Sequence, residues 1–216
     1  MVRVAPPPPE AARPPRPRRR ILPPGTPLRR IYDPARYGAN AVGMRRQGPF
    51  ARFDHHHPGR PGAPLSEDDR GIWYAGRTLD TALIEVFGSA DPARVVDLGG
   101  TERAAVVRAS RPLRLLDLRG AAALRAGTVH ALCAIPDYHL PQAWSRYFHE
   151  HPEIYGEVDG LLYPGAHDSG ACVALYERAS AALTSAADED LALSDLRLRR
   201  YLDDAAIRLG LTLLRG

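Results

Sequence analysis

Apolar and polar positions begin to alternate regularly at residues 28–32, in the manner of a half-buried strand. A continuous apolar run at residues 71–75 favours a second, more deeply buried strand. Thr78 is a suitable N-cap for the segment that follows, in which apolar side chains recur at helical spacing as far as Gly88. The pattern therefore predicts a strand, a long connection, a buried strand and then a helix.

Later segments continue this mixture. Strands are predicted at residues 104–108, 114–118, 158–163, 172–176 and 196–200. Helices are predicted at residues 121–125, 141–150 and 202–209. Because the order has no regular β-α-β rhythm, the pattern favours an α+β fold over a doubly wound sheet.

The first 27 residues differ in composition from the remainder of the chain. They contain ten of the 21 prolines, and residues 1–20 carry six arginines against one glutamate. Proline at this density favours a solvated, polyproline-like conformation. We therefore predict a disordered arm at residues 1–27 and a folded domain at residues 28–216. The arm is interpreted as a plain leader or, alternatively, as a segment that attracts nucleic acid or an acidic partner.

Composition narrows the classes of protein to consider. The net charge is +4, and all of the positive side chains other than histidine are arginine. Cys133 and Cys172 have no CxxC spacing, which argues against a disulfide scaffold or a cysteine zinc site. No apolar run approaches the roughly 20 residues of a membrane span, so we expect a cytoplasmic protein without a membrane partner. The common nucleotide-binding and hydrolase motifs are absent.

Residues 37–70 are rich in glycine, proline and histidine and are predicted to form a long loop with one strand-like piece at residues 50–53. The loop contains His55, His56 and His57, which are candidate metal ligands. Adjacent side chains on an extended chain point to opposite faces, so three consecutive histidines rarely close on one ion. We therefore expect no bound metal.

Glu85 is the most informative charged residue, because apolar side chains flank it in the predicted helix. A carboxylate in such a run needs a partner, since burying it bare costs several kcal/mol. Arg30 and Arg52 are the candidate partners. On spacing alone, a structural ion pair or a solvent-facing glutamate explains Glu85 equally well, and Tyr74 reads equally well as an ordinary core aromatic.

Taken in order, several sequence blocks resemble the RES family. The blocks are Arg30-Ile31, Phe50–Asp54, Ile72–Gly76, Thr81–Val86, Val158–Pro164 and Ala174–Glu177. The resemblance covers residues 28–178. It implies an ADP-ribosyltransferase-like α+β fold, with mixed β-sheets and flanking helices, that acts on NAD. Members include toxins of toxin–antitoxin pairs, which degrade NAD by hydrolysis or phosphorolysis or ADP-ribosylate a protein.

The resemblance also implies roles for individual residues. It aligns the family's two arginines with Arg30 and Arg52, its tyrosine with Tyr74 and its glutamate with Glu85. Glu85 would stabilise an oxocarbenium-like ribose or hold the ribose hydroxyls. The two arginines would bind the pyrophosphate, and Tyr74 would pack against the nicotinamide or ribose. Tyr32 is a further candidate for contact with NAD.

The family's serine has no direct counterpart in this chain. In many members it follows a Tyr-Pro or Val-Pro pair, but here Pro164 is followed by Gly165, and the nearby hydroxyl belongs to Ser169. In others it stands three residues before a glutamine of the central helix, where this chain has His139 ahead of Gln142. His139, Gln142 and Ser169 are therefore candidate binding residues, with capping or a surface position as the alternative for His139.

The expected activity is cleavage of NAD at the nicotinamide–ribose bond, with phosphate, water or a protein side chain as the acceptor. Candidate protein partners are an Xre-type antitoxin and a second copy of the chain. One alternative is an ADP-ribosyltransferase that modifies a specific protein. Another is a non-catalytic binding module that uses the basic arm to dock nucleic acid.

Overall fold

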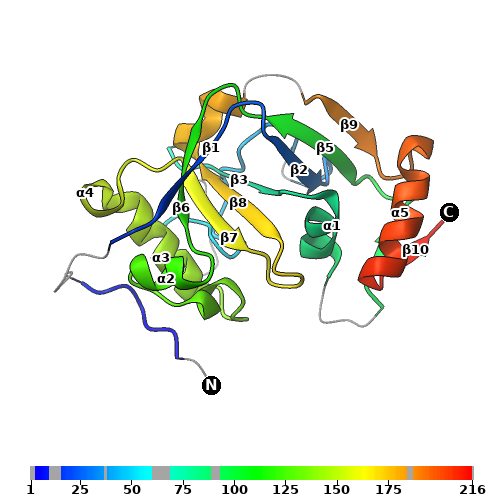
Figure 1. Ribbon diagram of the computed structural model, residues 1–216. Helices are drawn as coiled ribbons and strands as arrows, with labels where there is room; N and C mark the ends of the chain where they lie inside the picture. Colours follow the sequence, from blue (N-terminus) through cyan, green and yellow to red (C-terminus); the bar gives the residue numbers. More distant parts are fainter. Residues whose placement is uncertain are drawn as a thin grey trace.

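Eight strands form one sheet in the computed structural model, which describes residues 3–9, 16–36, 38–59, 69–88, 93–183 and 187–215 (Figure 1). The strands are β1 (Arg19–Leu22), β2 (Pro27–Tyr32), β3 (Ile72–Gly76), β5 (Arg103–Arg108), β6 (Leu113–Asp117), β7 (Gly160–Pro164), β8 (Ala171–Tyr176) and β9 (Glu189–Ala192). Their order across the sheet is β1-β6-β7-β8-β3-β2-β5-β9. The β6–β7 pair is parallel and the other neighbouring pairs are antiparallel.

Two groups of helices flank this sheet (Figure 1). The first group contains α2 (Ala121–Arg125), η1 (His130–Cys133), α3 (His139–Glu150) and α4 (Pro152–Tyr155), and the second contains α1 (Leu79–Phe87) and α5 (Leu196–Leu209). The 3₁₀ helix η2 (Glu177–Leu183) follows β8, and β4 (Val95–Asp97) pairs in parallel with β10 (Thr212–Leu214). The predicted α+β class, with mixed sheet and flanking helices, is confirmed.

Alternation along the strands gives the sheet two faces with different packing. On one face, Leu28 of β2 and Trp73 of β3 belong to the same apolar cluster. On the other, Ile31 of β2 packs with Leu83 of α1, and Tyr176 of β8 packs with residues of α3. We refer to these as the Trp73 face and the α1–α3 face. Side chains at even and odd positions of β2 therefore enter different environments.

The sheet opens between β2 and β3. These two strands pair at Arg29 and Gly76, near the start of β2 and the end of β3. At the other end of β3, Ile72 pairs with Arg45 of the preceding loop, through two backbone hydrogen bonds of 2.9 Å. Arg45 occupies the edge of β3 at Ile72, so the last residues of β2 do not pair with the first residues of β3. The two strands are separated there, and we call this separation the gap between β2 and β3.

Gly76 is required where β3 leads into α1. A Cβ atom at this position would lie 2.8 Å from the Ala82 nitrogen and 2.9 Å from the Thr78 oxygen, both backbone atoms of the helix start. Gly76→Ala is therefore expected to lower the free energy of unfolding by about 1–3 kcal/mol. Urea denaturation measures this, with Gly99→Ala as control, where the nearest atom is a side-chain oxygen at 3.3 Å. Equal losses in the two variants would contradict the predicted crowding.

Two predictions of local structure are wrong. Residues 196–200 form the start of α5, not a strand, because the Asp195 side chain caps the helix by accepting a hydrogen bond from the Arg197 nitrogen (2.9 Å). Over five residues, alternating leucine and arginine imitates a strand. Residues 50–53 form a turn, because the Asp54 carboxylate accepts hydrogen bonds from two backbone nitrogens of this segment.

The predicted disordered arm is also wrong for part of its length. Residues 19–22 form β1, which pairs with β6 along its whole length, and Leu22 is buried. Residues 18–22 contain no proline, so their backbone nitrogens are free to join the sheet. Further upstream, the Trp144 side chain donates to the Ala5 oxygen (2.8 Å). Residues 1–2 and 10–15 of the arm lie outside the described part of the chain.

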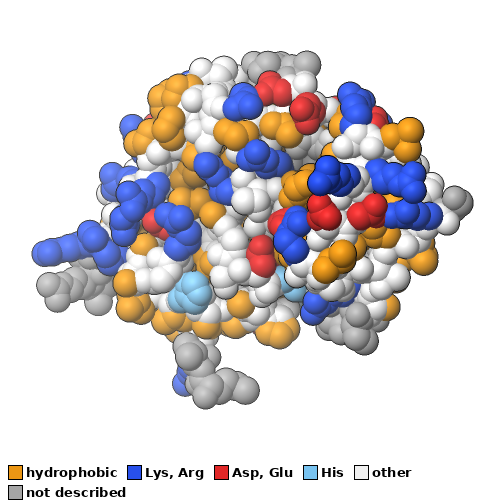
Figure 2. Space-filling view, turned by 45° about the vertical axis from the view of Figure 1, so that its right-hand side comes forward, with side chains coloured by type: hydrophobic (Ala, Val, Ile, Leu, Met, Phe, Trp, Pro, Cys, Tyr) orange, Lys and Arg blue, Asp and Glu red, His pale blue; other side chains and the backbone are white. Residues whose placement is uncertain are grey.

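Arginine side chains are spread over the face shown in Figure 2, with carboxylates among them mostly in its right half. Several arginines of the protein form ion pairs, such as Arg208 with Asp80 (2.9 Å) and Arg197 with Asp195 (2.7 Å). The abundance of arginine therefore does not by itself indicate a surface for nucleic acid. Among the described residues, no helix has both the length and the apolar character that crossing a membrane requires.

Candidate active site

A cavity of about 250 Å³ lies at the gap between β2 and β3. Three of the residues that line it are candidates from the sequence, namely Arg30, Tyr32 and Tyr74. The connection from β2 toward β3 supplies most of the remaining wall, including Arg45. The gap in the sheet thus brings side chains of two strands and a loop around one hollow.

Arg30 is a buried cation at this cavity. Its guanidinium carbon lies 5.4 Å from the Trp73 ring centre and 5.8 Å from the Tyr32 ring centre, so the side chain belongs to the Trp73 face. Burial, together with the nearby charge of Arg45, lowers the pKa of Arg30 to about 10. Arg30 remains charged at neutral pH, and among the described residues no carboxylate forms an ion pair with it.

Glu85 lies on the other face of the sheet. It lines a smaller cavity of about 60 Å³ with Arg29, Ile31, Tyr74 and Tyr163, among other residues. Its Oε1 atom accepts a hydrogen bond from the His167 nitrogen (3.3 Å). Neither Arg30 nor Arg52 forms an ion pair with Glu85, so the expected pairing is wrong. Strand alternation explains this for Arg30, because Arg29 and not Arg30 faces α1.

Tyr74 borders both cavities. Together with Ile31, it lines both of them. Its hydroxyl donates to Asp54 Oδ1 (2.8 Å) and accepts from the Phe53 nitrogen (3.1 Å). Burial and the adjacent Asp54 carboxylate raise the pKa of Tyr74 well above its ordinary value. The phenol is therefore neutral and fixed in position in the wall that the two cavities share.

Asp54 holds this arrangement in place. The carboxylate is fully buried and accepts from Arg45 Nη2 at both oxygens (2.7 and 2.8 Å). It also accepts from the backbone nitrogens of Phe50 (2.6 Å) and Ala51 (2.9 Å). One carboxylate thus fixes the 50–54 turn, the Arg45 guanidinium and the Tyr74 hydroxyl. From the sequence, Asp54 was named only as the last residue of the Phe50–Asp54 segment and was given no role of its own. An aspartate that closes its own turn is nevertheless a recognisable sequence signal.

Arg52 lines neither cavity. Its guanidinium lies 4.7 Å from the Tyr138 ring centre and donates to the Ile135 oxygen. The Arg52 guanidinium is nevertheless close enough to Tyr163 to influence the pKa of that phenol. Burial raises the pKa of Tyr163 well above its ordinary value, Glu85 adds to this effect, and Arg52 opposes it. Tyr163 is a site residue that the sequence did not single out.

Of the other candidates, Tyr32 lines the larger cavity, and Gln142, His139 and Ser169 line neither. Tyr32 reaches the larger cavity, but its hydroxyl donates to the Asp190 carboxylate (2.8 Å). Gln142 is buried and donates to the Ala51 oxygen (3.1 Å), which supports the turn that carries Arg52. His139, the first residue of α3, is exposed. Ser169 is exposed in the turn between β7 and β8.

The RES domain family matches residues 19–197 of the chain. The chain belongs to the RES domain family. The match begins at the first residue of β1, which agrees with the place of that strand in the sheet. A chain in the crystal structure of the M. tuberculosis MbcT–MbcA toxin–antitoxin complex has a similar fold, with a TM-score of 0.51 and 18% sequence identity over 83% of this chain and 88% of that chain. No curated protein shows significant sequence similarity to the chain.

In this RES domain, the position after Pro164 lies beside the Glu85 carboxylate. A Cβ atom on Gly165 would lie 2.9 Å from Glu85 Oε1. The same turn is tied to α1 through Asp168, whose Oδ2 accepts from the Thr81 hydroxyl (2.9 Å). The hydroxyl of a serine at residue 165 would therefore lie next to Glu85, whereas Ser169 is on the exposed side of the turn.

Proposed function

We propose that the protein consumes NAD by cleaving the bond between nicotinamide and ribose. Membership of the RES family and the resemblance to its NAD-degrading members support this substrate. The observation that carries the proposal is the pair of neighbouring cavities beside β2 and β3, which share Ile31 and Tyr74 in their walls. They offer a buried guanidinium, a neutral phenol and a carboxylate that forms no ion pair with any of the described residues, which are three types of group that this reaction uses.

Arg30 would bind the pyrophosphate. Burying a cation without an opposite charge is costly, and the phosphates of NAD would supply that charge. A guanidinium also gives two parallel hydrogen bonds to phosphate oxygens, which fixes orientation as well as charge. Arg52 is a less direct candidate, because its guanidinium already contacts Tyr138 and the Ile135 oxygen.

Glu85 would act on the ribose. When the glycosidic bond breaks, nicotinamide leaves with the bonding electron pair and positive charge develops on the ribose, where a fixed carboxylate stabilises it. Tyr74 would pack against the nicotinamide or the ribose at the junction of the cavities. Because 250 Å³ is below the roughly 300–1,000 Å³ of most small-molecule sites, the adenosine end of NAD would extend toward solvent.

The acceptor is tested by incubating the purified full-length chain with NAD, with and without inorganic phosphate, and identifying the products. Water as acceptor gives nicotinamide, ADP-ribose and a proton. Phosphate gives nicotinamide and ADP-ribose 1″-phosphate. Label transferred from NAD to a protein would identify the protein-modifying alternative. The absence of nicotinamide release under all of these conditions, from a folded protein, would contradict the proposal.

We further propose that the chain is the toxin of a toxin–antitoxin pair and acts in the cytoplasm. The similar fold in the MbcT–MbcA toxin–antitoxin complex supports this role. The partner would be an antitoxin that covers the entrance of the cavities. The alternative in which the basic arm docks nucleic acid is not tested by deleting residues 1–27, because this deletion would also remove β1 from the sheet.

A further inference from the structure

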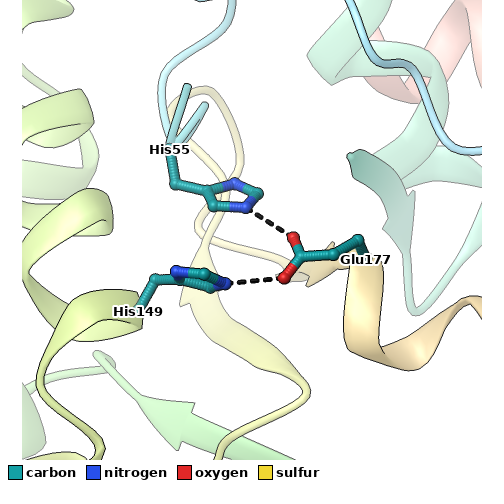
Figure 3. Close-up of side chains that lie close together, drawn as sticks. All are labelled: His55, His149 and Glu177. Atoms are coloured by element: carbon teal, nitrogen blue, oxygen red, sulfur yellow. Dashed lines mark hydrogen bonds and ion pairs between the residues drawn. The ribbon is translucent and has the colours of Figure 1, made fainter. Parts of the chain in front are cut away.

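Outside the two cavities, the side chains of His55, His149 and Glu177 lie close together, although they come from separate parts of the chain (Figure 3). His55 follows the turn that contains Asp54, His149 lies in the last turn of α3, and Glu177 begins η2. His55 Nε2 lies 2.7 Å from Glu177 Oε2, and His149 Nε2 lies 2.7 Å from Glu177 Oε1. The His55 ring is completely buried, and the other two side chains are mostly buried.

We propose that His55, His149 and Glu177 bind a divalent transition-metal ion, with Zn²⁺ as the best match. Two imidazole nitrogens and one carboxylate form a ligand set that zinc uses, and they leave a fourth position for water. One ligand atom from each residue can be chosen so that all three lie within 4.8 Å of one another. Ligand atoms bound to one tetrahedral zinc ion lie about 3.4 Å apart, so the most widely separated pair would have to approach by up to roughly 1.4 Å.

The charge states of His55 and Glu177 are compatible with this geometry. Metal ligation requires an unprotonated imidazole and an ionised carboxylate. Burial lowers the pKa of His55 to about 4, although the hydrogen bond to Glu177 opposes this effect. Burial opposes ionisation of Glu177, but hydrogen bonds from His149 and His55 lower its pKa well below the ordinary value. Both groups therefore have the charge state that binds a cation. Because each histidine donates from Nε2 to Glu177 when no ion is bound, this proton would move to Nδ1 when the ion binds.

The histidine tract contributes one ligand to this site. His57 points elsewhere, with a side chain that is 55% exposed and lies 3.3 Å from the Glu150 carboxylate. This agrees with the argument that consecutive histidines do not close on one ion. The three consecutive histidines in the sequence give no indication of His149 or Glu177, because these residues reach His55 only through the packing of α3 and β8.

The ion would have a structural role connected to the active site. His55 is the neighbour of Asp54 in the chain, and Asp54 holds both Tyr74 and Arg45. Coordination would fasten the loop before β3 to the end of α3 and to the residue that follows β8. The ion would therefore stabilise the folded protein and restrict the turn that positions Tyr74, without contacting NAD.

The test is titration of the chelator-treated full-length chain with Zn²⁺, followed by calorimetry and thermal denaturation. We expect one ion per chain and a higher melting temperature. Co²⁺ in place of Zn²⁺ should give the visible absorption of a four-coordinate site. His149→Ala and Glu177→Gln should each weaken binding by at least about 100-fold, because removing a ligand costs more than removing a residue that only supports one.

Two control variants separate this site from non-specific binding by histidine. His139→Ala changes an exposed residue at the opposite end of α3, and His57→Ala changes the exposed member of the tract. Both should bind Zn²⁺ as the unaltered protein does. The proposal is wrong if the unaltered protein shows no binding at one ion per chain. It is equally wrong if His57→Ala loses binding while His149→Ala retains it. Neither readout depends on NAD cleavage.

Discussion

Glu85→Gln is expected to slow NAD cleavage by about 10²–10³-fold while leaving the protein folded. Glutamine keeps the size of the side chain and can still accept from the His167 nitrogen, but it cannot balance positive charge on the ribose. Because the carboxylate acts mainly in the transition state, kcat should fall much more than KM rises. Nicotinamide release at saturating NAD measures the effect, and thermal denaturation checks the fold.

Asp80→Asn is the matched control for this substitution. Asp80 lies in the same helix, but it pairs with Arg208 and accepts from Tyr201 outside both cavities. Its removal should leave kcat almost unchanged. If the protein is a toxin, expression of the unaltered chain and of Asp80→Asn in bacteria should stop growth, and expression of Glu85→Gln should not. Equal turnover by Glu85→Gln and the unaltered chain would exclude the proposed role of Glu85.

Asp54→Asn is expected to lower the free energy of unfolding by about 3 kcal/mol, because it leaves the Arg45 guanidinium without its buried partner. For a chain of this length, each kcal/mol corresponds to about 2–4 °C in melting temperature. NAD cleavage should also fall at temperatures where the variant is folded, since the single amide oxygen of asparagine cannot serve Arg45, the two backbone nitrogens and the Tyr74 hydroxyl together, and the phenol is held less firmly. Thermal denaturation and steady-state kinetics give the two effects separately.

Asp159→Asn provides the comparison for Asp54→Asn. Asp159 is also buried and pairs with an arginine through two hydrogen bonds, from Arg111 at 3.0 and 2.6 Å, but it lines neither cavity. The Asp159→Asn substitution should therefore lower the stability of the protein but leave kcat and KM unchanged at temperatures where the variant is folded. If both variants have the same kcat and KM as the unaltered chain, Asp54 only stabilises the fold and does not position Tyr74.

The sequence was sufficient to predict the elements that carry the site. The strand with Arg30, the buried strand with Tyr74 and the helix with Glu85 all lie where local periodicity and the Thr78 cap indicated. These features depend on neighbouring residues, so they can be read from a short window. The same reasoning failed for residues 196–200, where a window of five residues could not distinguish a strand from the first turn of a helix.

How the strands, helices and loops pack against one another could not be predicted in the same way. Periodicity shows that Arg29 and Arg30 face opposite sides of β2, but it does not show which side contains α1. The gap between β2 and β3 results from Arg45 pairing with Ile72, which is a contact between a loop and a strand. The turn closed by Asp54 has a local sequence signal, but its contact with Tyr74 and the place of Tyr163 beside Glu85 appear only in the fold.

A crystal structure of Glu85→Gln with NAD would test the central claim most directly, because the bound dinucleotide should survive in this variant. The account predicts that Arg30 lies within hydrogen-bonding distance of the pyrophosphate. It also predicts that the Tyr74 ring contacts the nicotinamide riboside and that residue 85 faces the ribose. NAD bound away from the gap between β2 and β3, or with its phosphates remote from Arg30, would contradict it.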